Sequence, residues 1–176
     1  MLDIAVAYNR YRFLGNEFLT WLWYIIENEK AVVFQCDREA VGLEVGNRMI
    51  LENRWANGKE TISIKGDAVG LEEGQLCLSK GGAVTEINLI YKSGALQWQF
   101  SLKGESLNFS GLKLPESGAV EQPDDMEGIV LEKIDLYDKP IELVASLYQR
   151  FIELRLSDQW KATTARIEKW VHTQSF

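Results

Sequence analysis

One stretch, Phe13–Ile26, constrains the fold of this chain more than any other. Four large apolar residues recur in it at the i, i+3, i+4, i+7 spacing of an α-helix: Phe18, Trp21, Leu22 and Ile25. Three more crowd the flanks of that stripe: Trp23, Tyr24 and Ile26. We therefore predict a long helix from about Leu14 to Asn28 that is apolar almost all round. Such a helix must be covered on most of its surface, either by the rest of the chain or by a second protein.

Those two kinds of cover lead to different interpretations of the helix. In the first, which we favour, its aromatic residues pack in the core between a sheet and C-terminal helices. In the second, Trp23, Tyr24 and Ile26 on its second face form an interface with a partner or with a missing domain, because aromatic residues dominate the energetics of interfaces.

After Lys30 the periodicity of the apolar residues changes from helical to two, which predicts short strands. The first four runs are Ala31–Cys36, Val41–Val45, Arg48–Asn53 and Glu60–Lys65. Gly46-Asn47 and Asn57-Gly58 tolerate positive φ and predict hairpin turns. A short helix between Asp67 and Lys80, closed by Gly81-Gly82, fits the next stretch. From Val84 to Leu114 three alternating runs separated by Ser93-Gly94 and Lys103-Gly104 predict an antiparallel meander.

Helical spacing returns after the loop at 115–124. It first covers Met126–Ile134, and Pro140 at a first-turn position predicts the start of a second piece from Ile141 to Leu154. Ser157-Asp158 predicts the cap of a last helix. The order of helix, strands and helices lacks βαβ alternation, so we predict an α+β fold. It consists of a long N-terminal apolar helix, an antiparallel β-sheet meander, and C-terminal helices packed on one face.

At 176 residues the chain is long enough for one domain with a sizeable core. We expect residues 1–12 to be a lead-in or truncated linker and residues 13–176 to form the single domain. The start, Met1–Ala7, has neither the basic region nor the apolar length of a signal peptide. The apolar run around Trp21 is shorter than the roughly 20 residues that span a bilayer. We therefore predict a cytoplasmic protein with no membrane partner.

Catalytic signatures are missing from the sequence. The only histidine, His172, lies near the end of the chain without a nucleophile motif beside it. Cys36 and Cys77 each lie in an apolar run and are interpreted as reduced core residues, although a disulfide stays compatible with the sequence. The acidic pairs Asp124-Asp125 and Glu72-Glu73 are interpreted as solvated, with a nuclease metal site as the rarer alternative. We predict no enzyme activity, no metal and no cofactor.

The basic residues are scattered along the predicted sheet, at or near its turns. Six lysines are the candidates for phosphate contact: Lys59, Lys65, Lys80, Lys92, Lys103 and Lys113. The alternative, which we favour, is that these lysines only keep the sheet edges soluble. The net charge of −7 argues against nucleic-acid binding over the whole surface but leaves room for a local basic patch.

Taken in order, the motifs of the chain resemble the RdgC family of bacterial recombination-associated proteins, specifically the C-terminal half of its longer members. Phe13–Trp23 looks like the family's Leu-Gly-x-Glu-Phe-Leu-x-Trp-Leu-Trp helix. Shorter blocks continue the resemblance at Leu51–Asn53, Leu71–Glu73, Gly81–Leu89, Leu112–Pro115 and Leu147–Arg155, with Trp160 and Trp170. Gly81-Gly82 stands where the family often has Gly-Lys before a strand, and the family's N-terminal half is missing from this sequence.

What the resemblance implies is a non-catalytic, nucleoid-associated protein that binds duplex DNA with little sequence preference, forms a ring-shaped homodimer and restrains the RecA recombinase. Two other hypotheses remain beside it. One is a protein-interaction or oligomerisation module without DNA binding, and the other is a metal-dependent nuclease with converging carboxylates.

Overall fold

A computed structural model describes residues 13–29, 34–36, 39–55, 58–66, 71–116 and 126–173 of the chain. Its helices are α2 (Phe13–Asn28), α3 (Leu71–Ser79), α4 (Met126–Leu156) and α5 (Trp160–His172). Its strands are β1 (Phe34–Cys36), β2 (Glu39–Trp55), β3 (Gly58–Lys65), β4 (Ala83–Ser93), β5 (Leu96–Lys103) and β6 (Phe109–Lys113). The predicted lead-in at residues 1–12 lies outside the described residues.

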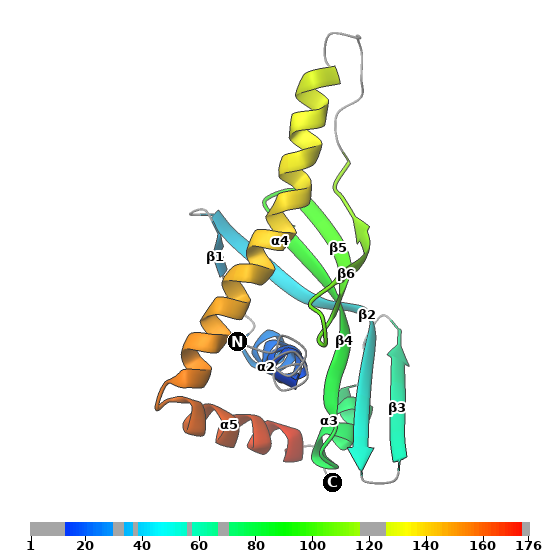
Figure 1. The fold of residues 1–176 in the computed structure, drawn as a ribbon, viewed down its shortest axis with the longest axis vertical. Coiled ribbons are helices and arrows are strands. Elements are labelled where there is room, and N and C mark those ends of the chain that lie inside the picture. Colours follow the sequence, from blue (N-terminus) through cyan, green and yellow to red (C-terminus); the bar gives the residue numbers. More distant parts are fainter. Residues whose placement is uncertain are drawn as a thin grey trace, which may run out of the picture.

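The strands form one antiparallel sheet in the order β1-β2-β4-β5-β6, and β3 pairs with β2 (Figure 1). The meander predicted between Val84 and Leu114 is confirmed by the continuous register of β4 with β5 and by the antiparallel pairing of β5 with β6, whose register shifts between Gln99 and Ser101. Gly94 has the positive φ of 57° that its turn requires. Strands β2 and β3 form the expected hairpin, but Gly58 already belongs to β3, where it pairs with Trp55 of β2, and residues 56–57 lie outside the described residues.

Strand β2 corrects one prediction. The two runs Val41–Val45 and Arg48–Asn53 belong to a single strand, and Gly46-Asn47 forms no hairpin turn between them. The register with β4 instead shifts between Val45 and Met49, which marks a bulge or irregularity. Gly46 is buried there against the side chain of Asn88, so its lack of a Cβ serves close strand packing.

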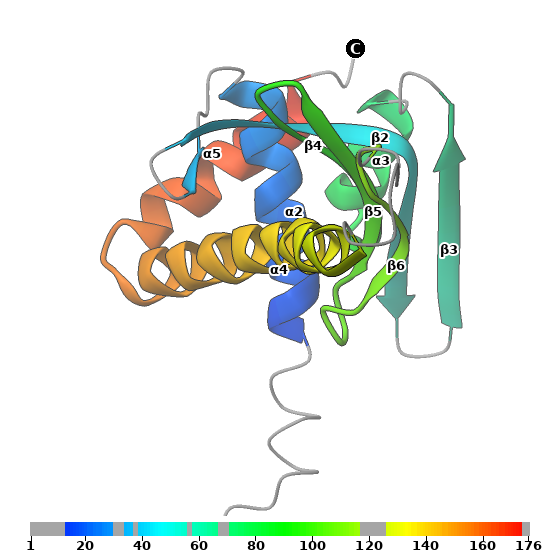
Figure 2. The same ribbon diagram turned by 90° about the horizontal axis from the view of Figure 1, so that it is seen from above.

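Helix α2 lies between the sheet and the C-terminal helices, as Figures 1 and 2 show from two directions. Phe18, Leu19 and Leu22 are completely buried. The ring of Phe18 packs edge-on against Tyr148 of α4, with ring centroids 5.2 Å apart. From the sheet, alternate residues of β4 and β5 complete this core: Ile87, Leu89, Tyr91, Trp98, Phe100 and Leu102. The predicted α+β architecture is confirmed.

Helix α4 corrects a second prediction, because it runs without interruption through Pro140. Proline has no N–H, so the carbonyl of Leu136, four residues earlier, lacks its usual intrahelical donor. The indole Nε1 of Trp98 in β5 donates a hydrogen bond to that carbonyl at 2.8 Å. A side chain from the sheet thus satisfies the helix where the sequence predicts a new helix start.

The ends of the shorter helices follow local sequence signals in part. Gly81 adopts a φ of 87° after α3, and the N–H of Gly82 donates to the carbonyl of Cys77, so the predicted glycine closure is confirmed. The predicted cap at Ser157-Asp158 comes two residues early, because the residue before α5 is Gln159, whose side chain makes no capping bond; the hydroxyl of Ser157 still accepts a hydrogen bond from the N–H of Gln159 at 3.3 Å. Within the described ranges, no helix is long and apolar enough to cross a membrane.

Candidate functional site

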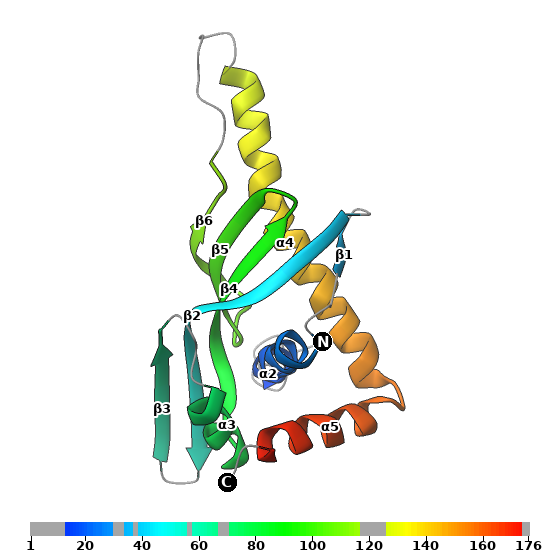
Figure 3. The ribbon, with the colours of Figure 1, turned by 180° about the vertical axis from the view of Figure 1, so that it is seen from behind.

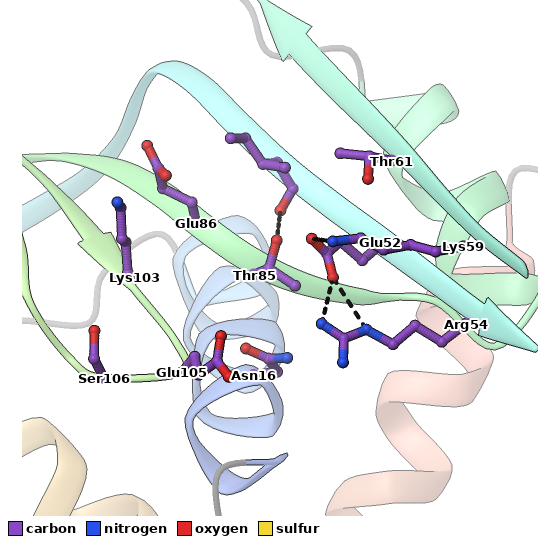
Figure 4. A pocket seen from close by; sticks show the side chains of 11 residues that line it. Asn16, Glu52, Arg54, Lys59, Thr61, Thr85, Glu86, Lys103, Glu105 and Ser106 are labelled. Carbon is purple, nitrogen blue, oxygen red and sulfur yellow. Dashed lines mark hydrogen bonds and ion pairs between the residues drawn. The ribbon is translucent and has the colours of Figure 1, made fainter.

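The described helices all pack on one face of the sheet, and no described helix lies on the other, which we call the open face (Figures 1 and 4). Side chains alternate along the strands, so Met49 and Leu51 of β2 point into the core while Arg48, Ile50 and Glu52 point away from it. Figure 4 looks onto this open face, with α2 behind the strands. A molecule that binds the sheet on the side opposite the helices contacts the residues of this open face.

Cationic side chains gather on the open face. They come from four neighbouring strands and from β3: Arg48, Arg54, Lys59, Lys65, Lys92, Lys103 and Lys113. Three carboxylates of the same strands share the face: Glu44, Glu52 and Glu86. The face therefore has a local excess of positive charge in a chain of net charge −7.

Five of the six lysines named from the sequence lie on this face, and one does not. Lys80 is in the turn that joins α3 to β4, where its backbone carbonyl accepts a hydrogen bond from Asn53. The sequence prediction missed Arg48 and Arg54. The sequence contained a signal for both arginines, because they alternate along the strand with Met49, Leu51 and Asn53, whose side chains point into the core.

Glu52 is the most heavily engaged carboxylate of the open face. Lys59 and Arg54 both form ion pairs with it, and Arg54 does so through two nitrogens at 3.2 and 2.9 Å (Figure 4). Burial alone would raise the pKa of Glu52, but the hydrogen bonds from the two cations outweigh it and hold that pKa below its usual value. Glu52 therefore stays ionised and partly neutralises the two cations.

The remaining cations differ in their partners. Lys92 pairs with Glu44 at 2.7 Å, and Arg48 lies 4.0 Å from Glu86. Exposed pairs of this kind are worth little and exchange readily with other anions. Lys113 donates to the side-chain oxygen of Gln99 on the neighbouring strand.

Lys65 and Lys103 form no ion pair with any carboxylate in the part of the chain that the structure describes. Both are exposed at strand ends. Their ammonium groups are therefore the most available to an incoming anion.

A polar pocket of about 620 Å³ opens on the same face (Figure 4). It lies where β4 runs past the end of β5, and Thr85 in it donates to the carbonyl of Ile50 at 3.2 Å. Its lining contains as many cations as carboxylates: Arg54, Lys59 and Lys103 against Glu52, Glu86 and Glu105. The hollow is thus polar but has no net charge of its own.

The middle of the open face is a network of neutral polar groups. Asn88 donates to Ser101 at 3.0 Å and accepts from Gln99 at 2.9 Å. These bonds join β4 to β5 on the outside of the sheet. None of the described side chains on this face is aromatic, since Tyr91, Trp98 and Phe100 all point into the core.

The burial of α2 argues against the alternative interpretation, in which Trp23, Tyr24 and Ile26 form an interface, and for the core interpretation that we favour. Trp23 and Tyr24 are only 1% and 9% exposed, and both pack edge-on against Trp170 of α5. Ile26 is partly buried against the same core. The flanking aromatic side chains are covered by the chain's own last helix, so they offer no surface to a partner.

The residues considered for catalysis are dispersed. His172 is exposed in the last turn of α5, and Glu72 and Glu73 are exposed in the first turn of α3. Asp124-Asp125 lie outside the described residues. In the ranges that the structure covers, no three His, Cys, Asp or Glu side chains gather as metal ligands would.

Of the two cysteines, Cys77 is a free thiol in the core, and the side chain of Cys36 lies outside the description. Burial, with the nearby charge of Glu60, raises the pKa of the Cys77 thiol. Cys77 therefore stays protonated and acts as a small core residue.

No protein-family model, no curated protein and no solved structure matches the chain.

Proposed function

We propose that this protein is a non-catalytic domain that binds duplex DNA without sequence preference through the open face of its sheet. The resemblance of its first helix to RdgC proteins motivates the further proposal that it takes part in the control of recombination. The observation that carries the DNA-binding proposal is the concentration of seven cations on the sheet face that none of the described helices covers (Figure 4).

The layout of the cations suits a duplex. Lys65 pairs with Arg48 across β3 and β2, and Lys103 pairs with Glu86 across β5 and β4. Glu86 lies opposite Ile50, two residues along β2 from Arg48, so the four residues form a diagonal line across the four adjacent strands. Neighbouring strands are about 4.8 Å apart, so the two terminal lysines are separated by roughly 15 Å at the backbone. That span is close to the roughly 12 Å width of the DNA major groove, and it lets the two lysines reach phosphates on opposite sides of a groove.

The lack of aromatic side chains supports a duplex over a single strand. Proteins that bind single strands stack unpaired bases on aromatic rings, and the described part of the open face offers none. Lysine and arginine on a polar surface contact phosphates, which carry no base identity. Binding of this kind is independent of sequence and sensitive to salt.

The test is fluorescence anisotropy of a labelled duplex of about 20 base pairs with the purified chain over a range of salt concentrations. The variant Lys65→Gln/Lys103→Gln removes two open-face lysines whose ammonium groups form no ion pair or side-chain hydrogen bond among the described residues. The matched control, Lys161→Gln/Lys169→Gln, removes the same charge from exposed positions on α5.

We expect the Lys65/Lys103 variant to flatten the salt dependence of log Kd by about 1.8, because each lost phosphate contact removes about 0.9. The control variant should keep the wild-type slope. A folded wild-type chain that shows no binding at low salt would refute the proposal. Equal losses in both variants would also refute it, because they would indicate a response to net charge alone.

A further inference from the structure

The first half of α4 projects beyond the sheet, as Figures 1 and 3 show from opposite sides. Large apolar side chains on it face solvent, with exposed fractions between 50% and 60%: Met126, Val130, Ile134, Tyr137 and Ile141. Scattered exposed apolar residues are normal on a soluble protein, but a contiguous set marks an interaction site.

These five residues form one stripe, which we call the α4 seam. Their spacings of four, four, three and four residues keep them within about 80° of arc, because each helical residue turns by 100°. Leu136, Pro140 and Leu143, which are buried against the body, lie on the adjacent side of the helix, about 110° from the centre of the seam. The α4 seam is therefore a continuous apolar stripe beside the buried side of the helix.

The same stripe continues into the core further along the helix. Val144, Tyr148 and Phe151 extend it, and there α2 covers it, with the rings of Phe18 and Phe151 5.6 Å apart. The covered half shows that this face of α4 is built for packing against another helix. Among the residues that the structure describes, nothing covers its first half.

Charged residues on the two flanks of the α4 seam complement each other. In a heptad with Ile134 and Ile141 at a and Tyr137 at d, Lys133 occupies a g position and Asp138 the following e position. In a parallel pair of helices a g residue meets the following e residue of the other helix. Lys133 of one copy would then face Asp138 of the other, and the two-fold symmetry of the pair would bring Asp138 of the first copy against Lys133 of the second.

We propose that the α4 seam pairs in parallel with the α4 seam of a second copy of this chain. The pairing ends near Ile141, because α2 occupies the stripe beyond it. Five half-exposed side chains of roughly 100 Å² each bury about 1,000 Å² in total over both copies, at the lower limit of specific interfaces. The dimer is therefore weak and depends on concentration, and it does not depend on DNA binding.

The experiment is sedimentation equilibrium of the whole chain between about 1 and 200 μM, the range in which an interface of this size is populated. We expect the mass to rise with concentration from 20.1 kDa towards twice that value. Ile134→Asp should weaken dimerisation at least tenfold, since it places a charge in the buried pair.

Leu156→Asp is the matched control. Leu156 is 81% exposed on the same helix but lies at its C-terminal end, beyond the part of the stripe that α2 covers, so its replacement should leave the dimer intact. Lys133→Asp should weaken the dimer at low salt, and Lys133→Asp/Asp138→Lys should restore it.

Three outcomes would overturn the proposal. A wild-type chain that stays monomeric over the whole range would indicate that another part of the chain covers the seam. Equal effects of Ile134→Asp and Leu156→Asp would indicate nonspecific association through any exposed apolar residue. Failure of the double charge reversal to restore association would exclude the parallel pairing.

Discussion

The hydrogen bond from Trp98 to α4 gives the sharpest test of how this fold is held together. Pro140 removes the N–H that would satisfy the carbonyl of Leu136, and the buried indole of Trp98 replaces it at 2.8 Å. Replacing Trp98 with Phe keeps an aromatic ring in the core and removes the donor. The carbonyl of Leu136 then lies in the core without a partner.

The expected cost of Trp98→Phe has two parts. An unsatisfied buried carbonyl costs about 1–3 kcal/mol. The smaller ring loses apolar contact and leaves a cavity, which adds about 1–2 kcal/mol. We expect a loss of about 3 kcal/mol in the free energy of unfolding, a large part of the roughly 5–15 kcal/mol of a typical domain.

A double-mutant cycle with Pro140→Ala isolates the hydrogen bond. Alanine at position 140 supplies the missing N–H, so Trp98→Phe should cost about 1–2 kcal/mol less in that background. The measurement is urea unfolding followed by circular dichroism at 222 nm, which does not depend on the tryptophan that is removed. Lys139→Ala is the control, because it changes helix propensity next door without adding an N–H.

If Trp98→Phe costs the same with proline and with alanine at position 140, to within about 0.4 kcal/mol, the two sites are independent. The proposed role of the indole in satisfying Leu136 would then be refuted, and the cost would be assigned to packing alone.

Three further predictions concern packing, pH and thiol chemistry. A Cβ at Gly15 would overlap the backbone oxygen of Gly104, so Gly15→Ala should destabilise the fold by more than about 2 kcal/mol. Gly128 lies in open space on α4, so Gly128→Ala should stabilise the fold by up to about 1 kcal/mol. Thermal unfolding of the two variants compares these effects. The pKa of Glu52 is lowered in the folded state, so its ion pairs contribute stability that is fully present above the ordinary pKa of a glutamate and is lost as the pH falls through the lowered pKa. Glu52→Gln should therefore make the urea midpoint of unfolding less dependent on pH at acidic pH. Cys77 is buried and its pKa is raised, so a thiol reagent at pH 8 should label it only as fast as the protein opens. Rapid labelling of Cys77 in the folded chain would contradict this prediction.

Local sequence patterns determined the elements that depend on neighbouring residues. The helix at Phe13–Asn28, the meander from Ala83 to Lys113 and the glycine closure after α3 all match the predictions. Each depends on a periodicity or a turn residue that acts within a few positions. The same alternation also divides the buried side chains of the sheet from the exposed ones.

Tertiary contacts decided what local patterns do not encode. Gly46 looks like a turn residue until Asn88, forty-two positions later, packs against it within a continuous strand. Pro140 looks like a helix start until Trp98 satisfies the carbonyl that it leaves open. In both cases a residue distant in sequence removes the energetic reason for a break.

The candidate site shows the same division. The lysines were visible as scattered turn residues, but only the pairing of β3, β2, β4 and β5 brings them onto one uncovered face with Arg48 and Arg54. The over-apolar first helix turned out to be covered by α5, while the uncovered apolar surface lies on α4. A sequence shows how much apolar surface a helix carries, but which part of it stays exposed depends on how the other elements pack around it.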